Sequence, residues 1–160
     1  MSIAKVTTVQ RSRKAQGNCH KCRKPINVGD PYKWFKVGFR ARFKHVRCIS
    51  PACHPRYSEL ESSRLSEVYA AQEDAEDRIE GAETIDEIND AISDLQDAIE
   101  ALADEYEEAS ENDDGVVFNT TAAEYAEVLQ GNDLQPVEEQ TDLDEAKEEA
   151  QQIINDIETP

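Results

Sequence analysis

The chain has 160 residues, enough for one or two small domains, and its formal charge of −18 is unevenly divided. Residues 1–64 hold 15 of the 17 lysines and arginines and three acidic residues, for a charge of +12, whereas residues 65–160 carry −30. No apolar run is long enough to cross a bilayer and the N-terminus lacks the apolar segment of a signal peptide, so we exclude a membrane protein and expect a cytoplasmic one.

The first segment in chain order is polar and basic, residues 1–16, and we expect a flexible arm. A small α+β module follows at residues 17–57. Its aromatic and β-branched content predicts two strands, 32–37 and 40–47, joined by a turn at Gly38. This module is predicted to be a compact β-hairpin finger.

Helical periodicity begins near residue 58, and a first helix is predicted to end at Gly81. Thr84 and Glu87 form a capping box that begins a second helix. That helix carries a heptad stripe about three heptads long. The stripe consists of Ile85, Ile88, Ile92, Leu95, Ile99, Leu102, Tyr106 and Ala109.

Because each apolar stripe is narrow, the helices must pair within the chain or between two copies of it. We expect residues 58–110 to form an acidic helical hairpin or coiled coil, with 60–80 packed against 85–110. Residues 111–160 are predicted to be an acidic tail, with a short helix from Thr121 and a C-terminal helix capped by Thr141.

The four cysteines all lie in the finger, as a C-x2-C pair and a C-x4-C pair: Cys19, Cys22, Cys48 and Cys53. Cytoplasmic thiols stay reduced, so paired cysteines there hold metal more often than they form disulfides. Four thiolates suit one tetrahedral Zn²⁺. His45 is an alternative ligand in place of Cys53, but that set leaves Cys53 as an unexplained free thiol, so we prefer the four cysteines.

The finger residues also carry a resemblance. The segments Cys19–Cys22, Ile26–Trp34, Val46–Leu60 and Tyr69–Glu73 resemble, in this order, small four-cysteine zinc-finger proteins encoded by tailed bacteriophages. The C-x2-C and H-x2-C order that includes His45 is similar to treble-clef fingers of the poly-ADP-ribose polymerase type. The resemblance implies a treble-clef or zinc-ribbon-like finger followed by acidic helices, in the cytoplasm of a host cell; it implies no activity.

The charge of the finger predicts a nucleic-acid partner, because basic side chains neutralise phosphates and aromatic faces stack on unpaired bases. The candidate binding residues are Lys33, Trp34, Lys36, Arg40, Arg42 and Lys44. An alternative is that Trp34, Phe35 and Phe43 form the finger core while the cations are only solvated.

A second hypothesis assigns the acidic helices a regulatory role. Their carboxylates could imitate the charge of nucleic acid and bind a basic host protein, so that the chain antagonises a host nucleic-acid-binding protein or enzyme; alternatively, they form a solvated helix face. Self-association through the heptad stripe is compatible with either hypothesis.

We do not expect an enzyme. The sequence has no G-x-S-x-G, no phosphate-binding glycine loop and no H-E-x-x-H, and no histidine lies outside the finger. Its carboxylates lie on predicted helix faces open to water, where they keep ordinary pKa values and make poor acid–base catalysts.

Overall fold

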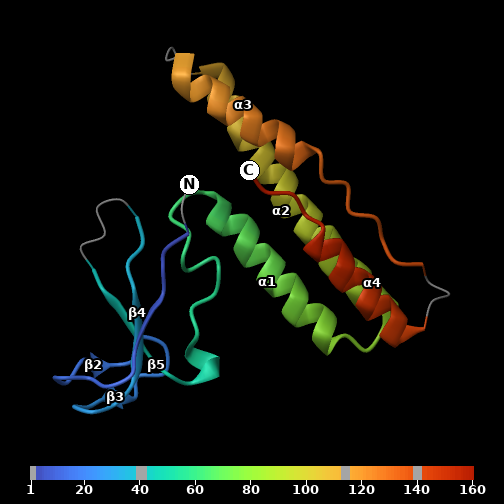
Figure 1. Ribbon diagram of the computed structural model, residues 1–160. Coiled ribbons are helices and arrows are strands. Elements are labelled where there is room, and N and C mark those ends of the chain that lie inside the picture. The colour runs from blue at the N-terminus through green and yellow to red at the C-terminus, as the bar shows by residue number, and fades with distance from the viewer. Residues whose placement is uncertain (1–2, 39–42, 113–115, 139–141) are drawn as a thin grey trace. The chain divides into compact units, whose positions relative to one another are not determined.

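The structure, a computed structural model, describes residues 3–38, 43–112, 116–138 and 142–160 (Figure 1). The chain divides into two compact units, Met1–Ser66 and Glu67–Pro160. The first is a small β-sheet unit and the second is helical, as the charge division and the change of periodicity predicted.

The first unit contains two small antiparallel sheets. One has three strands in the order β1-β4-β5, and the other pairs β2 with β3. The strands are β1 (Thr7–Val9), β2 (Gly17–Asn18), β3 (Pro25–Ile26), β4 (Tyr32–Phe35) and β5 (His45–Cys48). In the larger sheet Trp34 lies opposite Thr7 on one side and Val46 on the other. Residues directly opposite each other share a face, so this register separates the sheet into two packed faces.

One face of the sheet forms the core beside the cysteines. Tyr32 and Val46 are buried there with Ile26, and Val9 and Trp34 pack against them. The other face buries Phe35 and Arg47. The Arg47 guanidinium donates to the Glu59 carboxylate, which ties residues after the second cysteine pair to the sheet.

Three expectations for this unit need correction. Residues 7–9 of the expected flexible arm form β1, because a β-branched segment satisfies the open edge of β4. The second hairpin strand is 45–48 rather than 40–47, and Arg40 and Arg42 lie outside the described residues. Residues 58–64 belong to the finger rather than the helices: the Ala4 N–H donates to the Leu60 carbonyl (3.0 Å).

The second unit contains four helices: α1 (Leu65–Gly81), α2 (Ile85–Asn112), α3 (Val116–Gln130) and α4 (Leu143–Asn155). The predicted cap of α2 forms, since Thr84 Oγ1 accepts from the Glu87 N–H (3.3 Å), while the Glu87 carboxylate accepts from the Glu83 N–H (2.7 Å). The middle of the predicted stripe is buried: Ile88, Ile92, Leu95, Ile99 and Leu102.

The helix that packs most closely on α2 is α3, not α1. Figure 1 shows α3 running back along the C-terminal half of α2, and the Tyr106 and Tyr125 rings meet edge to face at 5.4 Å. Helix α1 contacts α2 through Arg78 and Asp94 (2.5 Å). The expected pairing of 60–80 with 85–110 is therefore not the closest pair of the unit. At α4 the capping residue is Asp142; Thr141 lies outside the described residues.

An extended segment between α3 and α4 is fastened to α2 by side-chain amides. Asn89 donates to the Val137 carbonyl (3.0 Å) and accepts from its N–H (2.8 Å). One heptad further on, Gln96 donates to the Asn132 carbonyl (3.3 Å) and accepts from the Leu134 N–H (3.1 Å). Each amide thus satisfies one backbone donor and one acceptor that an extended segment cannot satisfy within itself.

We predict that Asn89→Ala destabilises the helical unit by about 1–3 kcal/mol, because it leaves both backbone groups of Val137, itself 3% exposed, without their partner. Thermal unfolding followed by helical circular dichroism measures the loss. Asn155→Ala, at the exposed last residue of α4, makes the same chemical change and is the control. Equal unfolding midpoints for the two variants would contradict the role of the amide.

Candidate metal centre

The first two cysteines lie in the turn between β2 and β3. The Cys19 N–H donates to the Lys24 carbonyl (2.8 Å), and the Arg23 N–H donates to the Cys19 carbonyl (2.9 Å). These bonds curl the C-x2-C segment into a tight knuckle. Arg23 has φ of 63°, in the left-handed region that favours glycine, so the turn is formed at a conformational cost of about 1–2 kcal/mol.

The second pair comes from the end of the larger sheet. Cys48 is the last residue of β5, and Cys53 ends the short 3-10 helix η1 (Pro51–Cys53). The Cys53 N–H donates to the Ser50 carbonyl (3.0 Å), which folds the C-x4-C segment back on itself. The His20 N–H donates to the Val46 carbonyl (2.8 Å) and so connects the knuckle to β5.

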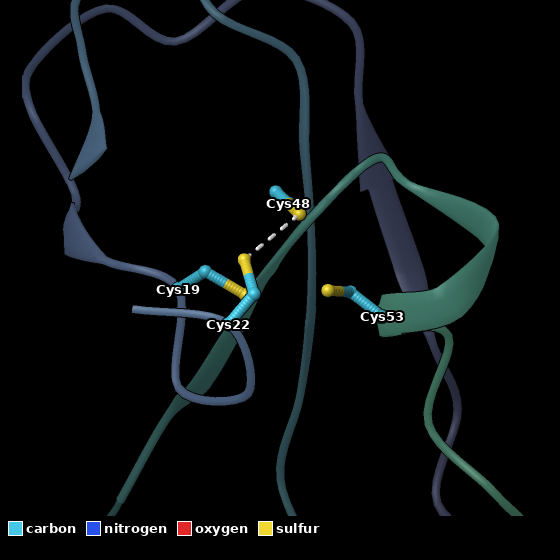
Figure 2. Close-up of side chains that lie close together, drawn as sticks. All are labelled: Cys19, Cys22, Cys48 and Cys53. Carbon is cyan, nitrogen blue, oxygen red and sulfur yellow. Dashed lines mark hydrogen bonds between the residues drawn. The ribbon is translucent and has the colours of Figure 1, made fainter. Parts of the chain in front are cut away.

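These elements bring the four sulfurs together, as the spacing predicted. All four Sγ atoms lie within 4.8 Å of one another, and Cys22 Sγ is 3.7 Å from Cys48 Sγ (Figure 2). A tetrahedral ion with metal–sulfur bonds of about 2.3 Å requires sulfurs about 3.8 Å apart. The cluster therefore has the size that a metal ion with four sulfur ligands needs.

Burial differs among the four side chains. Cys19 is 0% exposed and Cys53 is 3% exposed, whereas Cys48 is half-buried and Cys22 is exposed. The site is therefore closed on the side of the core and open to solvent at the knuckle.

The thiols of the cluster differ in acidity. Burial opposes ionisation of Cys19, but backbone N–H groups of Cys22, Cys48 and Lys21 donate to its sulfur and lower its pKa to about 6. Hydrogen bonding with the Cys48 thiol, together with burial, raises the pKa of Cys53 to about 12. Within one cluster, the surroundings thus favour the thiolate form of Cys19 and disfavour that of Cys53.

The three histidines lie outside the cluster. The His45 ring stacks on Phe35, with centroids 5.0 Å apart and an interplanar angle of 13°, and His20 meets it edge-on at 6.0 Å. His54 Nδ1 is 2.8 Å from Lys33 Nζ. Within the described residues, the four cysteines are the group of potential ligands close enough to share an ion, so the arrangement favours them over the set with His45.

The structure describes four of the six predicted nucleic-acid residues, and their surroundings differ. Lys36 is exposed, Lys33 contacts His54, and Arg40 and Arg42 lie outside the described residues. Lys44 Nζ lies over the Trp34 ring (4.8 Å to its centroid) and over the Tyr32 ring (5.0 Å). Trp34 is half-buried, and the Lys44 ammonium group already lies over one face of its ring.

Two residues differ from what the sequence pattern predicted. Arg47, one of the cations that give the finger its positive charge, is 6% exposed and pairs with Glu59. Phe43, which we considered for the core, is 81% exposed. Alternation along 40–47 could not reveal the exposure of Phe43, because the strand begins only at His45. Arg47 lies inside the strand, and its burial depends on Glu59 from another segment.

Comparisons with protein-family models, curated proteins and solved structures found no match to this chain. No helix of the described residues is both long and apolar enough to span a membrane.

We predict that metal affinity rises with pH by at least about tenfold per unit between pH 6.5 and 8, because the Cys53 thiol loses its proton when it binds. Cys19, with its pKa of about 6, adds to this dependence only in acid, where it too is protonated. Competition with a chromophoric chelator of known pH dependence measures the slope. Cys53→Ala should reduce it by about one proton; an affinity independent of pH would contradict the prediction.

Proposed function

We propose that the four cysteines bind one Zn²⁺ and that the protein is a non-enzymatic interaction protein whose metal has a structural role. The observation that carries this proposal is the approach of four sulfurs from two distant segments, two of them buried. Four thiolates complete the tetrahedral shell of Zn²⁺ and leave no position open for a substrate or a reactive water. The bound ion would supply cross-linking of the knuckle, β5 and η1.

Removing the ion should unfold the first unit and spare the second, because each unit has its own core. We expect Trp34 fluorescence to shift to that of an exposed indole in the presence of chelator, while most helical circular dichroism remains. Restoring Zn²⁺ should reverse the shift. Loss of helical signal in proportion to the fluorescence change would contradict independent units.

We further propose that the first unit binds nucleic acid through its positive surface. Its three acidic residues are used internally: the Asp30 carboxylate accepts from the Asn27 N–H (2.8 Å), and Glu59 pairs with Arg47. Burial disfavours the charge of Glu61, yet N–H donors from Ser63 and Ser62 lower its pKa below the usual range. The exposed cations are consequently not neutralised by these acids. They include Arg11, Arg13, Lys14, Lys21, Arg23, Lys24 and Lys36.

Titration with labelled oligonucleotides across a salt series tests this proposal. We expect the Zn²⁺-loaded chain to bind with a logarithmic salt slope of at least about 3, and Lys36→Ala to reduce that slope by about 1. Lys147→Ala, a cation of α4 whose Nζ donates to the Glu80 carbonyl (3.1 Å), is the matched control and should leave the slope unchanged. A parallel series with residues 1–66 isolates the contribution of the acidic unit. No binding by either protein at low salt would overturn the proposal.

A second candidate function rests on the acidic helices. The described carboxylates of the second unit are all exposed, apart from half-buried Glu73, and Arg78 and Lys147 are its two cations. Such a surface suits contact with a basic protein, on which it would take the place of nucleic acid. The resemblance to phage proteins makes a host protein the fitting partner. Competition between this chain and DNA for a bound basic protein would test it: release of the DNA supports imitation of nucleic acid, and undisturbed DNA contradicts it.

A further inference from the structure

The aromatic side chains of the first unit are not equally available to a ligand. Phe35 is 1% exposed and Tyr32 is 7% exposed, so both belong to the core. Trp34 is half-buried, and Lys44 Nζ lies 4.8 Å from its ring centroid. Phe43, by contrast, is 81% exposed. The sequence singled out Trp34 for stacking, but among the phenylalanine, tyrosine and tryptophan residues that the structure describes in this unit, Phe43 has the most accessible side chain.

The position of Phe43 is as informative as its exposure. It directly precedes Lys44, whose ammonium group stays with the Tyr32 and Trp34 rings, and it lies two residues before β5. Leaving a phenylalanine in water forgoes the stabilisation that its burial would contribute to a small core. An exposed ring on a unit whose residues 1–64 carry a charge of +12 fits a ligand that has both negative charge and flat apolar faces.

Unpaired nucleic acid has that combination. In a duplex the base faces are stacked on one another, so a phenylalanine ring reaches one only where two base pairs are unstacked, which costs free energy. In a single strand each base offers a face for an aromatic side chain, next to a phosphate for a cation. We infer that the ligand of the first unit is single-stranded nucleic acid and that Phe43 stacks on one of its bases. This inference rests on the proposed binding of nucleic acid.

The experiment uses the full Zn²⁺-loaded chain with a labelled single strand of about 12 nucleotides, as DNA and as RNA, and with a duplex of the same length. The wild-type chain should prefer the single strand. Phe43→Ala should weaken single-strand binding by about 5- to 100-fold and leave duplex binding and the salt slope unchanged, since stacking releases no counterions. Phe43→Trp should retain affinity, and Phe43→Leu, which keeps apolar character without a flat ring, should not.

Tyr57→Ala provides the matched control. Tyr57 is also exposed, at 62%, but it lies in the segment that follows the second cysteine pair rather than beside Lys44. The Tyr57→Ala variant should bind the single strand with the affinity of the wild-type chain. The metal stoichiometry of each variant checks that the finger remains folded. We expect it to remain folded because the Phe43 and Tyr57 side chains are both exposed.

The possible results separate the inference from the proposal on which it rests. Preference for the duplex, or wild-type affinity in Phe43→Ala, would overturn the stacking role and leave nucleic-acid binding standing. An equal loss in Tyr57→Ala would overturn the assignment to Phe43. Absence of binding to all three oligonucleotides would overturn both the inference and the proposed function. An equal loss of affinity for the DNA strand and the RNA strand in Phe43→Ala supports stacking on a base, without a contact to the sugar.

Discussion

The first unit depends on one constraint: Cys22 and Cys48 are 26 residues apart in the chain, yet their sulfurs lie 3.7 Å apart. Closing such a loop costs conformational entropy, and the apolar core available to offset it is small, with Ile26, Tyr32 and Val46 at its centre. A bound ion changes this balance, because structural Zn²⁺ contributes about 10–16 kcal/mol in small finger peptides. The left-handed backbone of Arg23 adds a further cost, which the proposed ion would offset.

In the second unit, the long-range contacts are made by helix packing and side-chain amides. Its α2 stripe buries Ile88, Ile92, Leu95 and Ile99, and its extended segment is fixed by Asn89 and Gln96. Because these amides are spaced one heptad apart, they lie on the same side of the helix and meet successive parts of the segment. Helix α2 thus provides both the buried apolar side chains and the hydrogen bonds that the backbone of the extended segment needs. This explains why so acidic a unit can form a core while its carboxylates remain in water.

The sequence predicted the features that depend on local spacing. The cysteine pairs, the cap at Thr84 and the buried stripe of α2 all follow from residues close together in the chain. It did not predict which helix would pack on that stripe, because a heptad pattern defines a face and not its partner. Likewise β1 joins the sheet through a partner more than 20 residues away, and Arg47 is buried because Glu59 reaches it from another segment. Such tertiary pairings have no local signature, and neither does the exposure of Phe43.

The two halves of the chain carry opposite charges, so the acidic unit affects the proposed binding of nucleic acid by the basic unit. The −30 half is covalently linked to the +12 half, and the boundary between the two units, at residues 66 and 67, lies inside α1. The negative charge of the second half repels phosphates and so opposes the proposed binding of nucleic acid by the first unit. Salt screens this repulsion as well as the attraction to the first unit, so the full chain should lose affinity with salt less steeply than residues 1–66 do. A ligand that adds stacking to charge gains affinity that this repulsion does not remove, which is a physical reason for an exposed aromatic ring on a unit already so positively charged.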